Sequence, residues 1–293
     1  MTLLESIVQG ILQGLAEFLP ISSSGHLSVY QHLTGITDGA LTATVFLHLG
    51  TLAAVFAVFW KKLLGLVVEL WLTIVDLFKG KLKLREMSER RRMLFMLIVS
   101  CLMLVLILPV KSNIEGLVGD GDIIVEGVGF LYSGVLILVS SAMAAQNGLG
   151  KTASNMRWID SVLIGVAQAI ATVPGVSRSG STISASLMLG CERDYAFDYS
   201  FILGTPAVLL ATALEVKDGI ESGIAVQPWI LGVGVLIAAV VGYFAIKLMG
   251  KLVRSGNFKY FGYYCLFIAV LTIGAGIYES VTGMRIGALL GLQ

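Results

Sequence analysis

The feature that most constrains the fold is a series of apolar runs of roughly 20 residues, each long enough to cross a bilayer as a helix. Hydrophobic residues make up 56% of the chain and charged residues only 13%, whereas soluble domains carry about a quarter charged residues. The sequence therefore predicts a single all-α integral membrane domain over residues 1–293. The predicted spans are about 41–60, 93–110, 123–144, 199–214, 229–249 and 260–278.

Two stretches interrupt this pattern with polar residues and helix breakers. The first begins at Gln13 and ends at His26, and the second begins at Gln168 and ends at Ser181. In both, the same number of residues separates the leading glutamine from the first serine. The apolar legs beside the first break are too short to cross, since roughly 16 helical residues reach only about 24 Å of a roughly 30 Å core. We interpret each stretch as a re-entrant helical hairpin, at about 3–33 and 159–189.

A second internal similarity extends the comparison, because Leu49-Gly50-Thr51 recurs as Leu203-Gly204-Thr205. The sequence thus predicts two repeats, at about 2–144 and 159–280, each with one hairpin and three spans. Since three spans are an odd number, the second repeat should be inverted relative to the first. Inverted repeats with interrupted helices place their binding site near the middle of the membrane.

Loop charges orient this arrangement. The segment 79–92 carries seven lysines and arginines, so the positive-inside rule makes it cytoplasmic. The acidic loops at 111–122 and 216–227 and both termini are then external, and the first hairpin enters from outside. We predict that residues 63–78, which contain Glu69 and Asp76, form a separate interfacial helix.

The first break carries groups that could perform chemistry. Gln13 and Glu17 are four residues apart and so share a helix face. One carboxylate and one amide oxygen make half of a hard-cation site, and water and phosphate oxygens can complete it. The alternative is that Glu17 is a polar packing residue between helices.

Ser22, Ser23 and Ser24 directly precede a helix, so one of them could be its N-cap. Three in a row exceed what a cap needs, and the free backbone N–H groups of a helix start also bind anions. A serine here with His26 as its base would form a nucleophile pair. The alternative for His26 is a helix-helix contact.

The second break adds a cation, Arg178, between Ser177 and Ser179. Its planar guanidinium suits phosphate oxygens, and we expect it to face Glu17, Ser23 and His26 if the repeats meet. The alternative is an Arg178–Glu17 ion pair that only holds the hairpins together. We expect His48, beside the first Leu-Gly-Thr motif, to be a packing or supporting group.

With both breaks, Gln13-x-x-x-Glu17-Phe-Leu-Pro-Ile-Ser-Ser-Ser-Gly-His26 and Pro174-Gly-Val-Ser-Arg178-Ser-Gly-Ser-Thr182, the chain resembles the undecaprenyl-diphosphate phosphatase family, also called the bacitracin-resistance protein family. The resemblance implies a membrane hydrolase that converts undecaprenyl diphosphate to undecaprenyl phosphate and inorganic phosphate. This recycles the lipid carrier for cell-wall polysaccharide synthesis and confers bacitracin resistance. It also implies a divalent cation, Mg²⁺ or Ca²⁺, and a multi-pass protein of the plasma (inner) membrane whose site opens to the extracytoplasmic side.

The resemblance also implies a role for each motif residue. Glu17 matches the essential acidic residue, Ser23 the serine proposed as nucleophile, His26 the essential histidine and Arg178 the phosphate-binding arginine. Gln13 stands where many members have a second glutamate, so Gln13 and Glu17 are the expected metal ligands. The expected substrate-binding residues are Ser22, Ser24, Ser177, Ser179, Ser181 and Thr182.

The competing hypothesis is a secondary transporter or flippase for a prenyl phosphate or another anionic substrate, because inverted repeats with broken helices are typical of transporters. The expected partners are the lipid-linked diphosphate and membrane lipids, with a homodimer left open. We expect no nucleic-acid partner, since no basic stripe with interleaved aromatics is present. Cys101, Cys191 and Cys265 have no paired or metal-ligand spacing and are expected to be packing residues.

Overall fold

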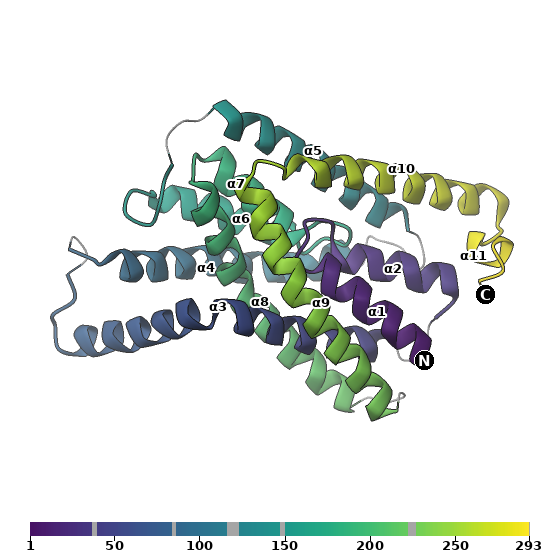
Figure 1. The fold of residues 1–293 in the computed structure, drawn as a ribbon, viewed down its shortest axis with the longest axis horizontal. Coiled ribbons are helices and arrows are strands. Elements are labelled where there is room, and N and C mark those ends of the chain that lie inside the picture. The colour runs from purple at the N-terminus through teal and green to yellow at the C-terminus, as the bar shows by residue number, and fades with distance from the viewer. Residues whose placement is uncertain (37–39, 84–85, 116–122, 147–149, 222–226, 293) are drawn as a thin grey trace.

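The computed structural model describes residues 1–36, 40–83, 86–115, 123–146, 150–221 and 227–292. Within these ranges the regular elements are α-helices, which confirms the predicted all-α membrane fold (Figure 1). In chain order they are α1 (Leu3–Ala16), α2 (Ser23–Thr34), α3 (Ala40–Phe78), α4 (Glu89–Glu115), α5 (Ile124–Gln146), α6 (Trp158–Ile170), α7 (Arg178–Met188), α8 (Arg193–Glu221), α9 (Pro228–Arg254), α10 (Lys259–Thr282) and α11 (Ile286–Leu289).

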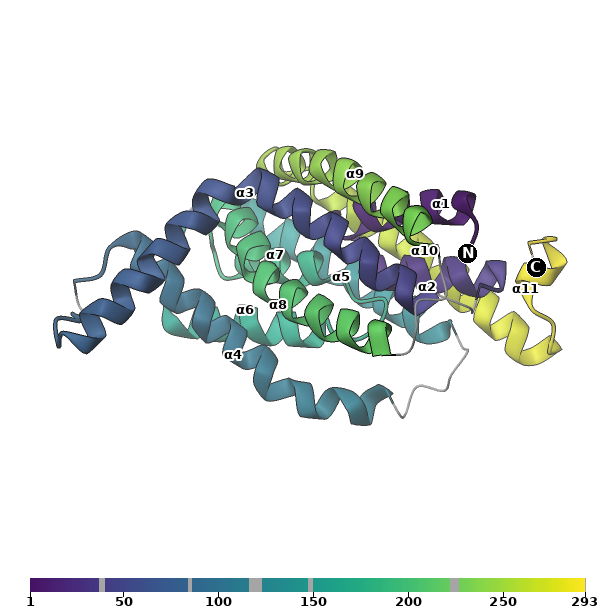
Figure 2. The same cartoon turned by 90° about the horizontal axis from the view of Figure 1, so that it is seen from below.

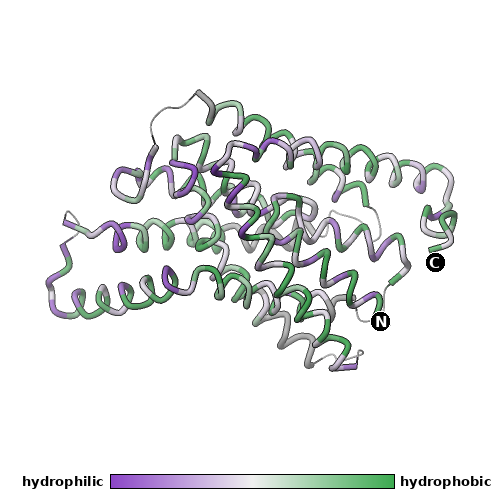
Figure 3. The backbone as a smooth tube through the Cα atoms, viewed as in Figure 1, coloured by the Kyte–Doolittle hydropathy of each residue, from purple (hydrophilic) through white to green (hydrophobic). Residues whose placement is uncertain are grey.

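Four of these helices are long and apolar enough to cross a membrane, namely α3, α5, α9 and α10. Large hydrophobic side chains on their outer faces are exposed, such as Leu236 on α9 and Phe267 on α10. Figure 3 shows these outer helices as mainly hydrophobic, while hydrophilic residues gather at the tip that joins α3 to α4. The helices α4 and α8 coincide with the two other predicted spans, and a total of six spans stays a prediction.

The two breaks lie between short helices, as expected for hairpins. The leading helices α1 and α6 contain 14 and 13 residues, so each reaches only about 20 Å. Each returning helix is capped by the first serine of its motif. The Ser22 hydroxyl accepts from the Gly25 backbone N–H at 3.3 Å, and the Ser177 hydroxyl accepts from the Gly180 N–H at 3.1 Å. The repeated sequence therefore builds the same cap twice.

Equivalent helices of the two predicted repeats make equivalent contacts. Helix α1 of the first predicted repeat packs along α9 of the second, and α6 of the second predicted repeat packs along α4 of the first. The helices α5 and α10 run side by side, and α3 contacts α8 (Figures 1 and 2). Small residues permit this closeness, since a Cβ at Gly10 of α1 would lie 2.7 Å from the Gly234 carbonyl oxygen of α9. This exchange of partners is what two copies of one unit would give; the repeat boundaries and their opposite orientations remain predictions.

The helix α3 corrects one expectation. It continues through Lys61 and Lys62 as one 39-residue helix, so the separate interfacial helix predicted at 63–78 is wrong (Figure 2). The reason is an ion-pair cluster with α4, in which the Arg91 guanidinium contacts Glu69 at 2.6 Å and Asp76 at 2.8 Å. Arg91 compensates the charge of both acids, and no proline interrupts the chain between Ala40 and Phe78, so the helix continues along α4.

The topology prediction is only partly covered by the described residues. Residues 116–122 and 222–226, the centres of the two acidic loops, lie outside them. The orientation of the chain in the membrane therefore stays a prediction.

Candidate active site

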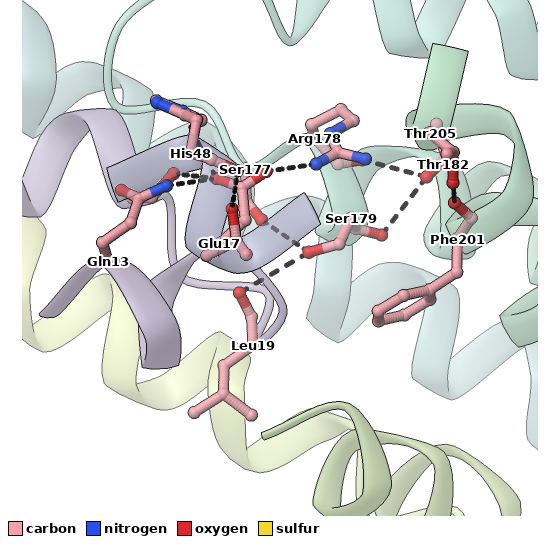
Figure 4. Close-up of polar contacts among 12 residues, drawn as sticks. Gln13, Glu17, Leu19, His48, Ser177, Arg178, Ser179, Thr182, Phe201 and Thr205 are labelled. Atoms are coloured by element: carbon pink, nitrogen blue, oxygen red, sulfur yellow. Dashed lines mark hydrogen bonds and ion pairs between the residues drawn. The ribbon is translucent and has the colours of Figure 1, made fainter. Parts of the chain in front are cut away.

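The two breaks meet through an ion pair. The Arg178 guanidinium at the start of α7 donates to the Glu17 carboxylate at the end of α1 (Figure 4). Glu17 is only 8% exposed, so its charge depends on this partner, because an unpaired charge at such a site is costly. A second, weaker contact joins Ser179 to the Leu19 carbonyl oxygen at 3.5 Å. The ion pair considered as the structural alternative is thus present, and it also brings the two motifs into one site.

Glu17 is the centre of the polar cluster. The Ser23 hydroxyl donates to Glu17 Oε2 at 2.6 Å, and the Gln13 side-chain amide donates to the same oxygen at 3.2 Å. Three residues from three different helices, Gln13, His48 and Arg178, converge on this carboxylate in Figure 4. In the described part of the chain, the Ser23 hydroxyl makes the shortest contact of a hydroxyl to a carboxylate, and Glu17 is its acceptor.

A glycine on α8 makes room for the arginine. A Cβ at Gly204 would lie 1.5 Å from Arg178 Nη1 and 2.7 Å from Cζ. Because neither distance is compatible with two non-bonded atoms, the guanidinium occupies the space that any larger residue would fill. Gly204 belongs to the second Leu-Gly-Thr motif, which thereby positions Arg178.

A cavity of about 470 Å³ opens at this cluster. Its volume lies within the range of small-molecule sites, which is about 300–1,000 Å³. The polar wall holds the expected Ser22, Ser23, Ser24, Ser177 and Arg178 together with Glu17, and the apolar lining comes from α1, α4, α8 and the connection between α6 and α7. The complete lining is Ala16, Glu17, Ser22, Ser23, Ser24, His48, Leu104, Gln168, Ala171, Thr172, Val176, Ser177, Arg178, Ala207, Val208 and Leu210.

The structure does not bring His26 to Ser23. His26 Nδ1 donates to the Ser22 carbonyl oxygen at 2.9 Å, which leaves Nε2 to accept from the Tyr264 hydroxyl at 2.8 Å. The imidazole also stacks on the Tyr264 ring and meets Phe130 edge to face. Both ring nitrogens are therefore committed away from the cavity, and the expected Ser23–His26 pair is not formed in this structure.

Three of the expected substrate-binding residues lie outside the cavity. Ser179 lines a smaller cavity behind Arg178. Ser181 and Thr182 are buried in α7, where the Thr182 hydroxyl donates to the Arg178 carbonyl oxygen at 3.0 Å. One turn of helix separates these two residues from the cavity wall, so they support the helix start that carries Arg178.

His48 is a site residue that the sequence interpretation underrated. Its Nδ1 donates to the Thr44 carbonyl oxygen at 2.8 Å, and Nε2 lies 3.8 Å from Glu17 Oε2. The bond to Thr44 fixes the ring so that Nε2 faces the carboxylate. The only sequence signal was its position beside the first Leu-Gly-Thr motif.

Gln13 and Glu17 are the candidate ligands for a divalent cation. Among the described residues, no group of three His, Cys, Asp or Glu side chains could hold a metal by itself. However, Gln13 Oε1 is buried without a hydrogen-bond partner, and it accompanies the Glu17 carboxylate. One carboxylate and one free amide oxygen fit a hard cation whose remaining ligands are water and phosphate oxygens.

Comparison with known proteins identifies the family of this chain. The family model of the bacitracin resistance protein BacA matches residues 6–271. An undecaprenyl-diphosphatase of Methanosphaera stadtmanae is 35% identical over 279 residues, which cover 92% of this chain and 97% of that protein. Undecaprenyl-diphosphatases of Halothermothrix orenii and Alkaliphilus metalliredigens are each 36% identical, covering 93% of this chain and 98% of theirs. The chain belongs to the bacitracin resistance protein BacA family.

Proposed function

We propose that this protein hydrolyses undecaprenyl diphosphate to undecaprenyl phosphate and inorganic phosphate. The observation that carries the proposal is the Glu17 carboxylate, which accepts the Ser23 hydroxyl at 2.6 Å and pairs with Arg178 at the wall of the cavity. A hydroxyl next to a base, with a fixed cation beside it, is the arrangement that phosphoryl transfer to serine requires. The name carried by the relatives agrees with this reaction.

The reaction starts with attack by Ser23. Its Oγ forms a bond to the terminal phosphorus while Glu17 Oε2 accepts the hydroxyl proton. The bond from that phosphorus to the bridging oxygen breaks, and undecaprenyl phosphate leaves. Water then attacks the phosphorus of the phosphoserine, and the bond from phosphorus to Ser23 Oγ breaks. Oγ takes back the proton that Glu17 holds, and the phosphate leaves as dihydrogen phosphate with both hydrogens of the water.

Arg178 supplies the fixed positive charge for this transfer. Its guanidinium can bind two phosphate oxygens at once. The backbone N–H groups at the starts of α2 and α7, which line the same cavity, also favour negative charge there. These groups stabilise charge as it develops on the transferring phosphoryl group. A phosphate that takes the guanidinium also removes the cation from Glu17 Oε1, which makes the carboxylate a stronger base toward the Ser23 proton at Oε2.

A divalent cation, Mg²⁺ or Ca²⁺, belongs to the proposal. Gln13 Oε1 and Glu17 would hold it together with oxygens of the substrate. When bound, it neutralises charge on the diphosphate. The free amide oxygen of Gln13 supports this assignment.

The proposed location is the plasma (inner) membrane, with the site open to the extracytoplasmic side. The apolar helices support a multi-pass protein, and the basic segment 79–92 favours a cytoplasmic tip of the α3–α4 pair. The prenyl chain would lie among membrane lipids while its diphosphate enters the cavity. In this role the protein recycles the carrier for cell-wall synthesis and confers bacitracin resistance.

Phosphate release from undecaprenyl diphosphate by the purified protein in detergent tests the proposal. We expect turnover by the wild type and a loss on the order of 10²–10³ in Glu17→Gln, because an amide cannot accept the Ser23 proton. A protein that moves the lipid between leaflets of vesicles without releasing phosphate would instead be a flippase, and the proposal would fail.

A further inference from the structure

Gln168 is a buried polar residue of the cavity that the mechanism above does not use. It lies on α6, is only 2% exposed, and lines the same cavity as Glu17 and Arg178. Neither its Oε1 nor its Nε2 has a hydrogen-bond partner in the described part of the chain. Exchanging the two atoms would not help, because both are unpartnered. A buried amide without partners is costly and uncommon, so it calls for a ligand from outside the chain.

The equivalent glutamine of the first repeat explains how this situation arises. Gln13 donates to Glu17, one helical turn further on, at 3.2 Å. The residue one turn after Gln168 is Thr172, and its hydroxyl donates to the Ala169 carbonyl oxygen at 2.8 Å. The second predicted repeat therefore has the glutamine, but it lacks the carboxylate that accepts from the glutamine amide in the first repeat.

The surroundings of Gln168 indicate what kind of ligand would satisfy it. Although the same cavity is lined by serine, threonine and glutamate oxygens, none of them is bonded to the Gln168 amide. Arg178 and the N-terminus of α7 lie on the same cavity and favour an anion. A ligand that brings several charged oxygens would give both N–H groups of the amide an acceptor.

We propose that Gln168 binds a phosphate oxygen of the lipid diphosphate and so positions the substrate opposite Glu17. This inference rests on the proposed function. The amide is neutral, and the diphosphate carries charged oxygens both before and during phosphoryl transfer. Gln168 therefore contributes to substrate binding in both states, and its removal raises KM more than it lowers kcat.

The test compares two substitutions at Gln168 with one control, using the purified full chain. Gln168→Leu keeps the approximate size and removes both donors, so KM should rise roughly 10- to 100-fold, the value of a hydrogen bond to a charged group. Its thermal midpoint should stay equal or increase, because an unpartnered buried amide is removed. Gln168→Glu places a carboxylate against the phosphate and should raise KM further.

The control is Gln31→Leu on α2. The Gln31 amide donates to Gln9 at 3.1 Å and to Thr44 at 3.3 Å, so its loss should lower the thermal midpoint and leave KM unchanged. An unchanged KM in Gln168→Leu, or a Gln168→Glu variant with wild-type kinetics, would overturn the inference. So would a fall in the thermal midpoint of Gln168→Leu without a rise in KM, since that marks a role within the protein.

Failure of the proposed function would look different. If the wild type released no phosphate, we would measure the shift of its thermal midpoint by inorganic diphosphate. A shift that is smaller in Gln168→Leu than in the wild type supports a phosphate contact by Gln168. Equal shifts in both proteins, or none in either, contradict it.

Discussion

Substitution of Gly204 by alanine should abolish most activity through Arg178 without unfolding the protein. The added Cβ would lie 1.5 Å from Arg178 Nη1, whereas non-bonded heavy atoms approach to about 3.5 Å. The guanidinium must therefore move by about 2 Å. Such a shift breaks its contact with Glu17, since hydrogen bonds fail beyond about 3.2–3.5 Å.

The expected effect on turnover is that of misplacing a group aimed at developing charge, a loss on the order of 10²–10³. Stability should change little, because alanine gains up to about 1 kcal/mol over glycine in a helix. That gain offsets part of the lost ion pair. The assay is phosphate release together with a thermal midpoint for each variant.

Gly232→Ala on α9 is the matched control. A Cβ at Gly232 meets no atom within 4 Å, so this variant gains the same helix propensity and should keep wild-type turnover. In an Arg178→Ala background, Gly204→Ala should cause little further loss, because residues that act as a unit are not additive. Wild-type turnover in Gly204→Ala, or a full additional loss in the double variant, would refute the claim that Gly204 acts through Arg178.

Three further predictions concern the cation, the guanidinium and the topology. Gln13→Glu should retain activity and lower the Mg²⁺ concentration needed for half-maximal turnover, because it adds a charged ligand; a titration with Mg²⁺ that shows no shift would argue against Gln13 as a ligand. Arg178→Lys should lose most turnover although it keeps the charge, because an ammonium cannot bind two oxygens in the plane of a fork; near-normal phosphate release would contradict this. In a cysteine-free background, a membrane-impermeant thiol reagent applied to intact cells should label Met284→Cys and spare Lys83→Cys, and the reverse pattern would invert the topology.

The partnership of the two breaks could be predicted from the sequence because its causes are local. Glu17 and Arg178 stand in otherwise apolar runs, where an isolated charge requires a partner of opposite sign. Each also belongs to one of the two serine-rich breaks, Glu17 at the end of α1 and Arg178 at the start of α7, so the repeated pattern linked both to the same kind of element. The need for charge compensation then determined which residues met.

The remaining contacts depend on tertiary packing that spacing does not encode. Ser23 reaches Glu17 across an irregular turn in which Ser22 adopts a φ of 69°, so no helical periodicity relates the two residues. The same turn directs His26 toward Tyr264, which is 238 residues away in the chain. His48 reaches the site only because α3 passes beside α1, and a histidine in an apolar helix gives no sign of that.

The most direct test of the central claim is the rate of phosphate release by Ser23→Ala, with Ser24→Ala as its control. Both residues line the cavity, but Ser23 contacts Glu17 at 2.6 Å, whereas the Ser24 hydroxyl contacts Ser22 at 3.3 Å. We predict that Ser23→Ala, folded normally by its thermal midpoint, loses at least about 10²-fold in turnover and that Ser24→Ala stays within a few-fold of the wild type. A fully active Ser23→Ala would contradict attack by this hydroxyl and would transfer the role of nucleophile to water.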